Sequence, residues 1–360
     1  DAVIVTPPPL ENPCAETGMQ PYDYSQVLCM SYLFYEAQRS GKLPADQRIT
    51  WRGDSALDDG SDVGHDLSGG YYDAGDRVKF GFPMAFTATM LAWGLIDFAE
   101  GYEIAGQTEY GQVGVKWATD YFLKAYTAKN EFYGQVGKGD IDHNSNAGRP
   151  EDMTMERPSY KIDEEHPGSE LAGETAAALA AASIVFKSLF YLLTGESQYS
   201  DLINQYLNWL QNEAPYTPEG LVYLVDWGSN RDAANACFLT LWAAKHGLNT
   251  EVNQEWARGQ IGQLLGDNPR YQSFVVGYGV NPPVRPCHGS SACPNPPEDC
   301  TGSFNNPGPN PHTLFGALVG GPDADGNYND NRTDWQHNEV ACDYNAGFTG
   351  SLAALVEISN

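Results

Sequence analysis

Apolar residues along the chain recur mainly at intervals of three and four, a spacing that places their side chains on one face of a helix. The simplest case is Val113, Trp117 and Tyr121, which lie four residues apart. Few segments alternate between apolar and polar residues as strands do. The spacing predicts about eight helices, over residues 26–40, 83–100, 113–121, 169–194, 202–209, 231–246, 250–266 and 344–358, with Pro83 in a first turn and Gly247 as a C-terminal stop.

Long irregular segments separate these helices. Residues 51–82, 129–168 and 268–343 are rich in Gly, Pro, Asp and Asn, and they far exceed the usual length of a connection, which is typical of loops that carry function. No linker divides the helical pattern. The sequence therefore predicts an extended N-terminal arm over residues 1–20 and a single all-α domain over residues 21–360, with its chemistry on loops.

Composition and charge exclude some classes of function. The 360 residues are 41% hydrophobic, enough for a large core, and no uninterrupted apolar stretch is long enough to cross a bilayer. The formal net charge of −27 argues against nucleic acid, whose phosphates need a basic surface, and favours solubility. The chain opens at Asp1 without a signal peptide, as a processed protein would. We therefore expect a secreted, extracellular protein that contacts no membrane.

Aromatic residues and cysteines add two further indications. There are 21 Tyr and 8 Trp, whose flat apolar faces and polar edges suit stacking on sugar rings, although most will be core residues. The 7 cysteines are an odd number, so at least one thiol is unpaired or pairs between chains. Cys293 and Cys300 bracket a stiff polar loop, which predicts a disulfide in an oxidising compartment. The Cys-x-x-Cys spacing of a zinc site is absent, and no metal site is predicted.

Two segments hold clustered carboxylates. The first runs from Gly69 to Asp76, where Asp73 and Asp76 stand three residues apart among glycines. Both can point into one cleft, where one could orient the other or a shared water. An Asp-rich turn or a cation site is the alternative interpretation of this segment.

The second cluster runs from Asp323 to Asp330 and leads to Glu339. A calcium-binding EF-hand would need glycine at its sixth position, where Tyr328 stands. Apolar residues follow Glu339, so we expect a raised pKa for its carboxyl group. Glycosidic hydrolysis needs such a protonated acid opposite a carboxylate that activates water. The chain has neither the Gly-x-Ser-x-Gly of a serine hydrolase nor a phosphate-binding P-loop.

At these residues the chain resembles the family-nine glycoside hydrolases, endoglucanases (cellulases) on an (α/α)6 barrel, in their animal-type secreted form. The resemblance covers nearly the whole chain and includes residues 51–56, 69–80, 148–153 and 227–229 with Arg231. The C-terminal signature of the family is matched at Tyr328, Asp330, Trp335, Glu339, Ala341, Asn345 and Ala346, a highly specific spacing.

The resemblance implies a role for each site residue. Asp76 would be the general base that deprotonates the attacking water, Asp73 would hold that water, Glu339 would be the general acid, and Asp330 would support the site. The predicted sugar-binding residues are His143, Trp227, Arg231, His288 and Tyr344. Because the family inverts the anomeric carbon, base and acid should stand roughly 6.5–9.5 Å apart.

The chain departs from the family in three places. Pro286-Cys287-His288-Gly289 stands where the family has Pro-His-x-Arg, and no Trp follows His143. Around residues 188–189 the chain lacks a stretch that the family fills with helical hairpins. The resemblance therefore implies a barrel with long active-site loops at one end. It leaves open whether that barrel is incomplete around residues 188–189. Family members often carry calcium in that stretch, so calcium is doubtful here and no cofactor is expected.

Two functions remain open. The favoured one is a monomeric endo-β-1,4-glucanase that hydrolyses cellulose and related β-glucan chains with inversion. The alternative is a catalytically weak or inactive relative that only binds β-glucan. This alternative is favoured by Cys287, Gly289, the lost Trp and the missing hairpins. The departures at 287 and 289 predict a slow enzyme, because nothing obvious in the sequence replaces the family's guanidinium.

Overall fold

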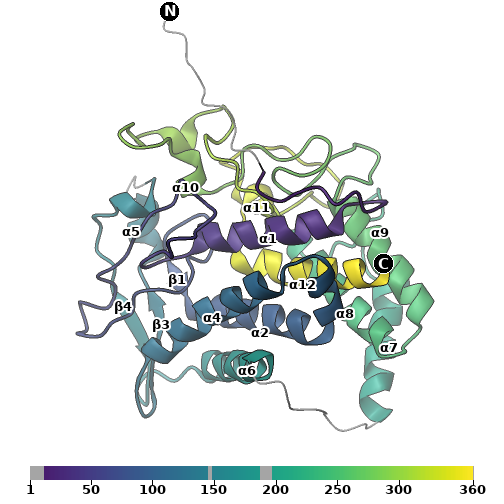
Figure 1. The fold of residues 1–360 in the computed structure, drawn as a ribbon, viewed down its shortest axis with the longest axis horizontal. Coiled ribbons are helices and arrows are strands. Elements are labelled where there is room, and N and C mark those ends of the chain that lie inside the picture. The colour runs from purple at the N-terminus through teal and green to yellow at the C-terminus, as the bar shows by residue number, and fades with distance from the viewer. Residues whose placement is uncertain (1–11, 145–147, 187–196, 360) are drawn as a thin grey trace, which may run out of the picture.

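A computed structural model describes residues 12–144, 148–186 and 197–359, and helices predominate in it (Figure 1). Eight long helices coincide with the predicted ones to within a few residues at most of their ends, so the all-α expectation is confirmed at this level. They are α1 (Tyr24–Gln38), α2 (Gly81–Asp97), α4 (Thr108–Ala125), α6 (Ser169–Phe186), α7 (Ser197–Asn212), α8 (Ser229–Lys245), α9 (Thr250–Leu264) and α12 (Cys342–Ser359).

Local signals fix where several of these helices begin and end. Asp23 caps α1 by accepting the backbone N–H of Gln26 at 3.0 Å. Gly247, just after α8, has φ +81°, so it stops the helix as predicted. The predicted helix over residues 83–100 is in fact two, because the chain turns at Phe98 between α2 and the short α3 (Ala99–Ile104).

The C-terminal helix α12 lies at the centre of the core. It packs against α1, α2, α3 and α8, and Figure 1 shows it in yellow among them. Nearly every residue from Cys342 to Val356 is buried. Because the predicted acid Glu339 stands three residues before this helix, a largely buried element of the fold anchors it.

The loops contain a small sheet that the sequence did not predict. Strand β3 (Glu131–Val136) pairs antiparallel with β1 (Lys79–Phe80), β2 (Tyr126–Ala128) and β4 (Ser159–Ile162). The remaining short elements are α5 (Gly139–Asn144), α10 (Gly289–Ala292), α11 (Trp335–Asn338) and two 3-10 turns at Pro150–Asp152 and Ser303–Asn305. These strands are too short for an alternating pattern to stand out in the sequence.

Helix α6 is only shallowly embedded in the fold. It packs against α2 and α4, yet only 22% of its 18 residues are buried. By length and composition alone it could cross a membrane, in contrast to the expectation that no apolar stretch is long enough to do so. A single such helix does not by itself indicate a membrane protein. The predicted break at residues 188–189, just beyond α6, lies outside the described residues.

An apolar hollow of about 390 Å³ lies between α2, α7 and α8. Its walls are almost entirely aromatic and aliphatic. The lining residues are Trp93, Ile203, Tyr206, Leu207, Leu239 and Trp242.

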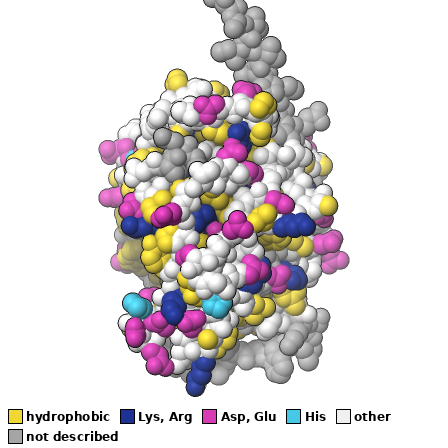
Figure 2. Space-filling view, turned by 90° about the vertical axis from the view of Figure 1, so that its left-hand side faces the viewer, with side chains coloured by type: hydrophobic (Ala, Val, Ile, Leu, Met, Phe, Trp, Pro, Cys, Tyr) yellow, Lys and Arg dark blue, Asp and Glu magenta, His cyan; other side chains and the backbone are white. Residues whose placement is uncertain are grey.

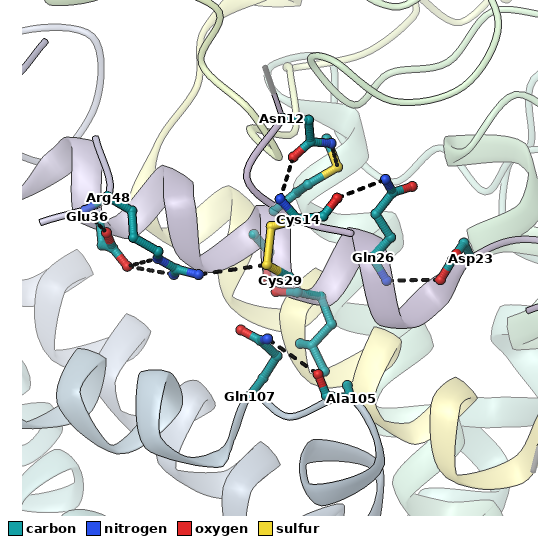
Figure 3. The surroundings of a disulfide bond; sticks show 12 residues. Asn12, Cys14, Asp23, Gln26, Cys29, Glu36, Arg48, Ala105 and Gln107 are labelled. Carbon is teal, nitrogen blue, oxygen red and sulfur yellow. Dashed lines mark hydrogen bonds and ion pairs between the residues drawn. A yellow bond between two sulfur atoms is a disulfide. The ribbon is translucent and has the colours of Figure 1, made fainter. Parts of the chain in front are cut away.

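Two disulfides lie within the described residues. Cys293–Cys300 is the predicted one, and Cys14–Cys29 is a second that the sequence analysis missed. Figure 3 shows Cys14 joined to Cys29 of α1, with Gln26 donating to the carbonyl of Cys14 at 3.1 Å. The end of the predicted N-terminal arm is therefore tied to the domain, while residues 1–11 lie outside the described part.

The surface carries the acidic balance of the sequence. On the face shown in Figure 2, acidic side chains are spread from top to bottom and Lys and Arg side chains lie singly among them. This distribution agrees with the net charge of −27.

Candidate active site

The segment with Asp73 and Asp76 forms a tight loop just before β1. The N–H of Asp73 donates to the carbonyl of Val78 at 3.0 Å, and the N–H of Val78 donates to Oδ1 of Asp76 at 3.1 Å. Gly75 lies directly against the chain at Cys287, where an added Cβ would come within 2.1 Å of the carbonyl oxygen of Cys287. Only glycine allows this contact.

Backbone hydrogen bonds connect this loop to the segment that carries Glu339. Cys287 donates its N–H to the carbonyl of Asn338 at 2.7 Å, and Gly289 donates to the carbonyl of Gly75 at 2.8 Å. Cys342 donates to the carbonyl of Asp73 at 2.8 Å. Three segments far apart in the sequence therefore meet, and they bring the predicted base and the predicted acid into one site.

Glu339 has the surroundings of a carboxylic acid. Its Oε2 accepts hydrogen bonds from Nε1 of Trp227 at 2.9 Å and from the hydroxyl of Tyr344 at 3.1 Å. Burial raises the pKa of Glu339, the charges of Asp76 and Asp343 raise it further, and the two hydrogen bonds partly offset the increase. The protonated form, which a general acid needs, is thereby favoured.

Asp76 faces a histidine. Its Oδ2 lies 3.2 Å from Nε2 of His143, and 18% of its side chain is exposed to solvent. The hydrogen bond to Asp76 raises the pKa of His143. The predicted base is therefore open to water and has a positively polarised partner.

Asp73 is a desolvated carboxyl group among other carboxylates. Burial raises its pKa well above the ordinary value, and the charges of Asp343, Asp76 and Glu339 raise it further. Its Oδ1 has no hydrogen-bond partner among the described residues. This oxygen can therefore hold a water molecule beside Asp76.

Asp330 acts on the backbone. Its two oxygens accept the N–H groups of Val284 at 2.9 Å and Arg285 at 3.0 Å. It fixes the loop that leads to Cys287, a placement that fits the predicted supporting role.

Trp227 and Arg231 lie beside the acid. Gly228 adopts φ +65°, and an added Cβ would lie 2.4 Å from the hydroxyl of Tyr344, so the turn into α8 requires glycine. Trp227 is 49% exposed, and Arg231 lies 5.3 Å from the ring centre of Tyr344. An exposed indole, a guanidinium and an acid are thus presented together.

His288 is placed differently from its prediction as a sugar ligand. Only 3% of it is exposed, its Nε2 lies 2.8 Å from Oε1 of Gln38, and its Nδ1 accepts the N–H of Ser291 at 3.0 Å. Burial lowers its pKa to about 3. Both ring nitrogens are engaged, so the neutral imidazole supports the loop from within.

Cys287 occupies the place beside the acid and the base instead. Burial raises the pKa of its thiol, and the charges of Glu339 and Asp76 raise it further. The thiol therefore stays protonated, which makes it a weak hydrogen-bond donor and a poor nucleophile.

Three further residues belong to the site and were not predicted. Asp343 lies 3.4 Å from Nη1 of Arg231 and contributes to the raised pKa of Asp73. Arg77 forms an ion pair with Asp142 at 2.9 Å. Asp343 and Arg77 are sequence neighbours of the predicted Tyr344 and Asp76, and Asp142 is a neighbour of His143; this adjacency was the only signal available.

One group of side chains has the spacing of a metal site. The ligand atoms of Asp76, Asp142 and His143 lie within 4.8 Å of one another. Arg77 already supplies the positive charge there, because its guanidinium binds Asp142 on both carboxylate oxygens. We therefore assign the cluster to an ion-pair network.

A pair of carboxyl groups in different environments, with an exposed tryptophan beside the acid and a helical scaffold beneath, defines the site of a glycoside hydrolase. The chain belongs to glycosyl hydrolase family 9, whose family model matches residues 24–194 and 189–352. This membership was expected from the signature around Glu339.

Curated relatives and solved structures agree. Endoglucanase A of Bacillus pumilus is 39% identical over 452 residues, which span 94% of this chain and 67% of the relative. Endoglucanase 14 of Arabidopsis thaliana is 36% identical over 92% of this chain and 93% of the relative. The endoglucanase of the termite Nasutitermes takasagoensis has a TM-score of 0.90 and 47% identity, over 94% of this chain and all of that one. The cellulase Cel9M of C. cellulolyticum, solved with cellobiose, has a TM-score of 0.83 and 30% identity over 94% of this chain and 99% of that one.

The comparisons also locate a gap in this chain. The match to Endoglucanase A covers 94% of 360 residues, about 338, whereas the alignment is 452 residues long. Its relatives therefore carry about 110 residues that this chain lacks. The two parts of the family match meet at residues 189–194, which agrees with the break predicted around residues 188–189.

Proposed function

We propose that this chain is an endo-β-1,4-glucanase that hydrolyses cellulose and related β-glucans with inversion of the anomeric carbon. One observation carries the proposal: Glu339, with a raised pKa, shares a site with the partly exposed Asp76, and Trp227 donates to Glu339 at 2.9 Å. The family and the endoglucanases among its relatives supply the substrate class.

The residues divide the reaction between them. Glu339 gives its proton to the glycosidic oxygen as the bond to the anomeric carbon breaks. Asp76 takes a proton from the water that attacks the opposite face of the sugar, and Asp73 holds that water with its free Oδ1. Trp227 offers a face for stacking and Arg231 bounds the sugar site, while Tyr344 is only 2% exposed and acts through its hydrogen bond to Glu339.

We further propose that the helices follow the (α/α)6 barrel of the neighbouring family structures and that the enzyme acts outside the cell as a monomer without a cofactor. The similarity to the termite structure supports the first statement. The disulfides Cys14–Cys29 and Cys293–Cys300 support an oxidising compartment.

Glu339→Gln and Asp76→Asn should each lower turnover on carboxymethylcellulose by ~10²–10⁴, because both groups act on the transition state. Binding of cello-oligosaccharides, measured by calorimetry, should change little. Glu100→Gln on the exposed start of α3 is the matched control and should keep full turnover. Near-full activity of Glu339→Gln would overturn the assignment of the acid.

A second candidate is a relative that binds β-glucan without cleaving it. The burial of His288 and the chain's lack of about 110 residues favour it. The same assay decides, since such a protein would release no reducing sugar even as the wild type, while calorimetry would still detect binding.

A further inference from the structure

Gly289 is buried against the side chain of Arg77. An ideal Cβ at Gly289 would lie 2.9 Å from Nη1 of Arg77, 3.2 Å from the carbonyl oxygen of Gly75 and 3.4 Å from that of Gly148. The N–H of Gly289 donates to the carbonyl of Gly75 at 2.8 Å, so the backbone is held in place. Any side chain at position 289 therefore competes with the guanidinium of Arg77 for the same space.

The guanidinium of Arg77 is fixed from two sides. Its Nε and Nη2 meet the carboxylate of Asp142 at 3.1 and 2.9 Å, and Nη2 also donates to the backbone carbonyl of Asp142 at 3.2 Å. The carbonyl of Arg77 accepts Nη1 of Arg157 at 2.6 Å. Arg77 and Asp142 are 7% and 2% exposed, so this pair is buried. Arg77 thus holds both the side chain and the backbone of α5.

The residue after Asp142 is the partner of the base. His143 follows it on α5, and its Nε2 lies 3.2 Å from Oδ2 of Asp76. Asp76 in turn precedes Arg77 in the chain. Two neighbouring pairs in the chain, Asp76–Arg77 and Asp142–His143, are therefore joined by the Arg77–Asp142 ion pair and the His143–Asp76 contact. The position of the imidazole depends on that ion pair.

We propose that Arg77 is a positioning residue whose guanidinium fills the space that the family signature gives to an arginine at position 289 and, through Asp142, keeps His143 against Asp76. The inference rests on the proposed function, because that function makes Asp76 the base. Gly289 is then the matching partner of Arg77, since its missing side chain makes room for the guanidinium. A guanidinium absent at position 289 is thus supplied by Arg77 from the opposite segment.

The first test requires no catalysis. The charged groups that act on His143 are Asp76, Asp142 and Arg77, and the positive charge of Arg77 lowers the pKa of His143. Removing that charge alone would raise the pKa of His143. Losing the contact with Asp76 would instead lower it towards about 6.5. Loss of the Arg77 charge and loss of the Asp76 contact therefore shift the pKa of His143 in opposite directions.

NMR titration of the His143 imidazole in the full chain gives the answer. Arg77→Asn should lower the pKa of His143, and Arg77→Lys, which keeps a cation opposite Asp142 and protects the fold, should lower it less. Lys116→Asn, which removes an exposed ion pair on α4, should leave it unchanged. A pKa of His143 that rises or stays constant in Arg77→Asn and Arg77→Lys would overturn the proposal.

The second test moves the guanidinium across the site. Arg77→Asn and Gly289→Arg should each lower kcat about ten- to a hundredfold with KM changed less than about threefold, because positioning acts on the transition state. The double variant, which has its guanidinium at 289, should recover most of the lost kcat. A double variant no better than the poorer single one would overturn the pairing. If the wild type cleaves no β-glucan, the proposed function fails, and the titration of His143 still decides the role of Arg77.

Discussion

At the scale of single residues, the carboxyl groups of the site differ in their surroundings. Asp330 accepts two backbone N–H groups, Glu339 is half-buried beside Trp227 and Tyr344, and Asp73 is desolvated among other carboxylates. Burial and charge thus raise the pKa of Glu339 and Asp73. The raised pKa keeps Glu339 protonated, as a general acid must be.

The residues of the site could be predicted only as far as sequence spacing carries information. The resemblance to the family predicts that Trp227, Glu339 and Tyr344 are site residues, and the structure brings these three together. Arg77 could not be predicted, because its partner Asp142 lies 65 residues away on α5. His288 has the chemistry of a ligand, but burial against Gln38 outweighs it.

Asp73→Asn should stabilise the protein at neutral pH. Because the pKa of Asp73 is raised in the folded state, the folded protein retains a proton that the unfolded chain loses above pH of about 4. Stability from this group is therefore full below that pH and is lost as pH rises through the folded pKa. Asparagine removes the penalty, so the free energy of unfolding in urea should rise by about 1 kcal/mol at pH 7.5 and hardly change at pH 4.

Asp330→Asn provides the contrast, because it weakens two hydrogen bonds to the backbone and should lower stability. A gain in Asp73→Asn that is equal at both pH values would contradict the assigned cause.

At the scale of elements, the helices could be predicted and the sheet could not. Helices such as α4 and α12 are long enough for a repeat of three and four to recur several times. Strand β1 is 2 residues long, and β3 is stabilised by pairing with strands from two other segments. The loop of Asp73 and Asp76 likewise takes its shape from contacts with residues 287–289, which no local pattern reveals.

Gly75→Ala should separate the base from the acid. Its methyl group would collide with the carbonyl of Cys287 and push the 73–76 loop away from the Glu339 segment. We expect kcat to fall at least tenfold and the unfolding free energy to fall by about 1–3 kcal/mol. Gly259→Ala on α9 is the control, because nothing lies within 4 Å of its Cβ and alanine favours a helix interior, so it should stabilise slightly. Equal effects of the two substitutions would refute the close contact at Gly75.

At the scale of the whole molecule, the chain is a shortened member of its family. Its relatives carry about 110 residues that it lacks, and the family match is divided at residues 189–194. Next to this point, α6 is only 22% buried and an apolar hollow is lined by Trp93, Trp242 and neighbours from α7. Soluble proteins rarely leave contiguous apolar surface of this kind open.

Restoring the lacking segment should therefore stabilise the molecule. A chimera that carries the corresponding stretch of Endoglucanase A of Bacillus pumilus between residues 186 and 197 should have a higher Tm and bind less of the hydrophobic dye ANS. A glycine-serine stretch of equal length is the control and should change neither quantity in that direction. An unchanged Tm and dye signal in the chimera would mean that the hollow is not where the relatives pack their additional residues.

The central claim is that Asp76 and Glu339 hydrolyse β-1,4-glucan by a single displacement, with water attacking from the side opposite the leaving group. Proton NMR of the anomeric signals during the first minutes of cello-oligosaccharide cleavage by the wild type tests it most directly. The new reducing end should appear first as the α-anomer and only later equilibrate with the β-anomer. A β-anomer from the outset, or no cleavage at all, would contradict it.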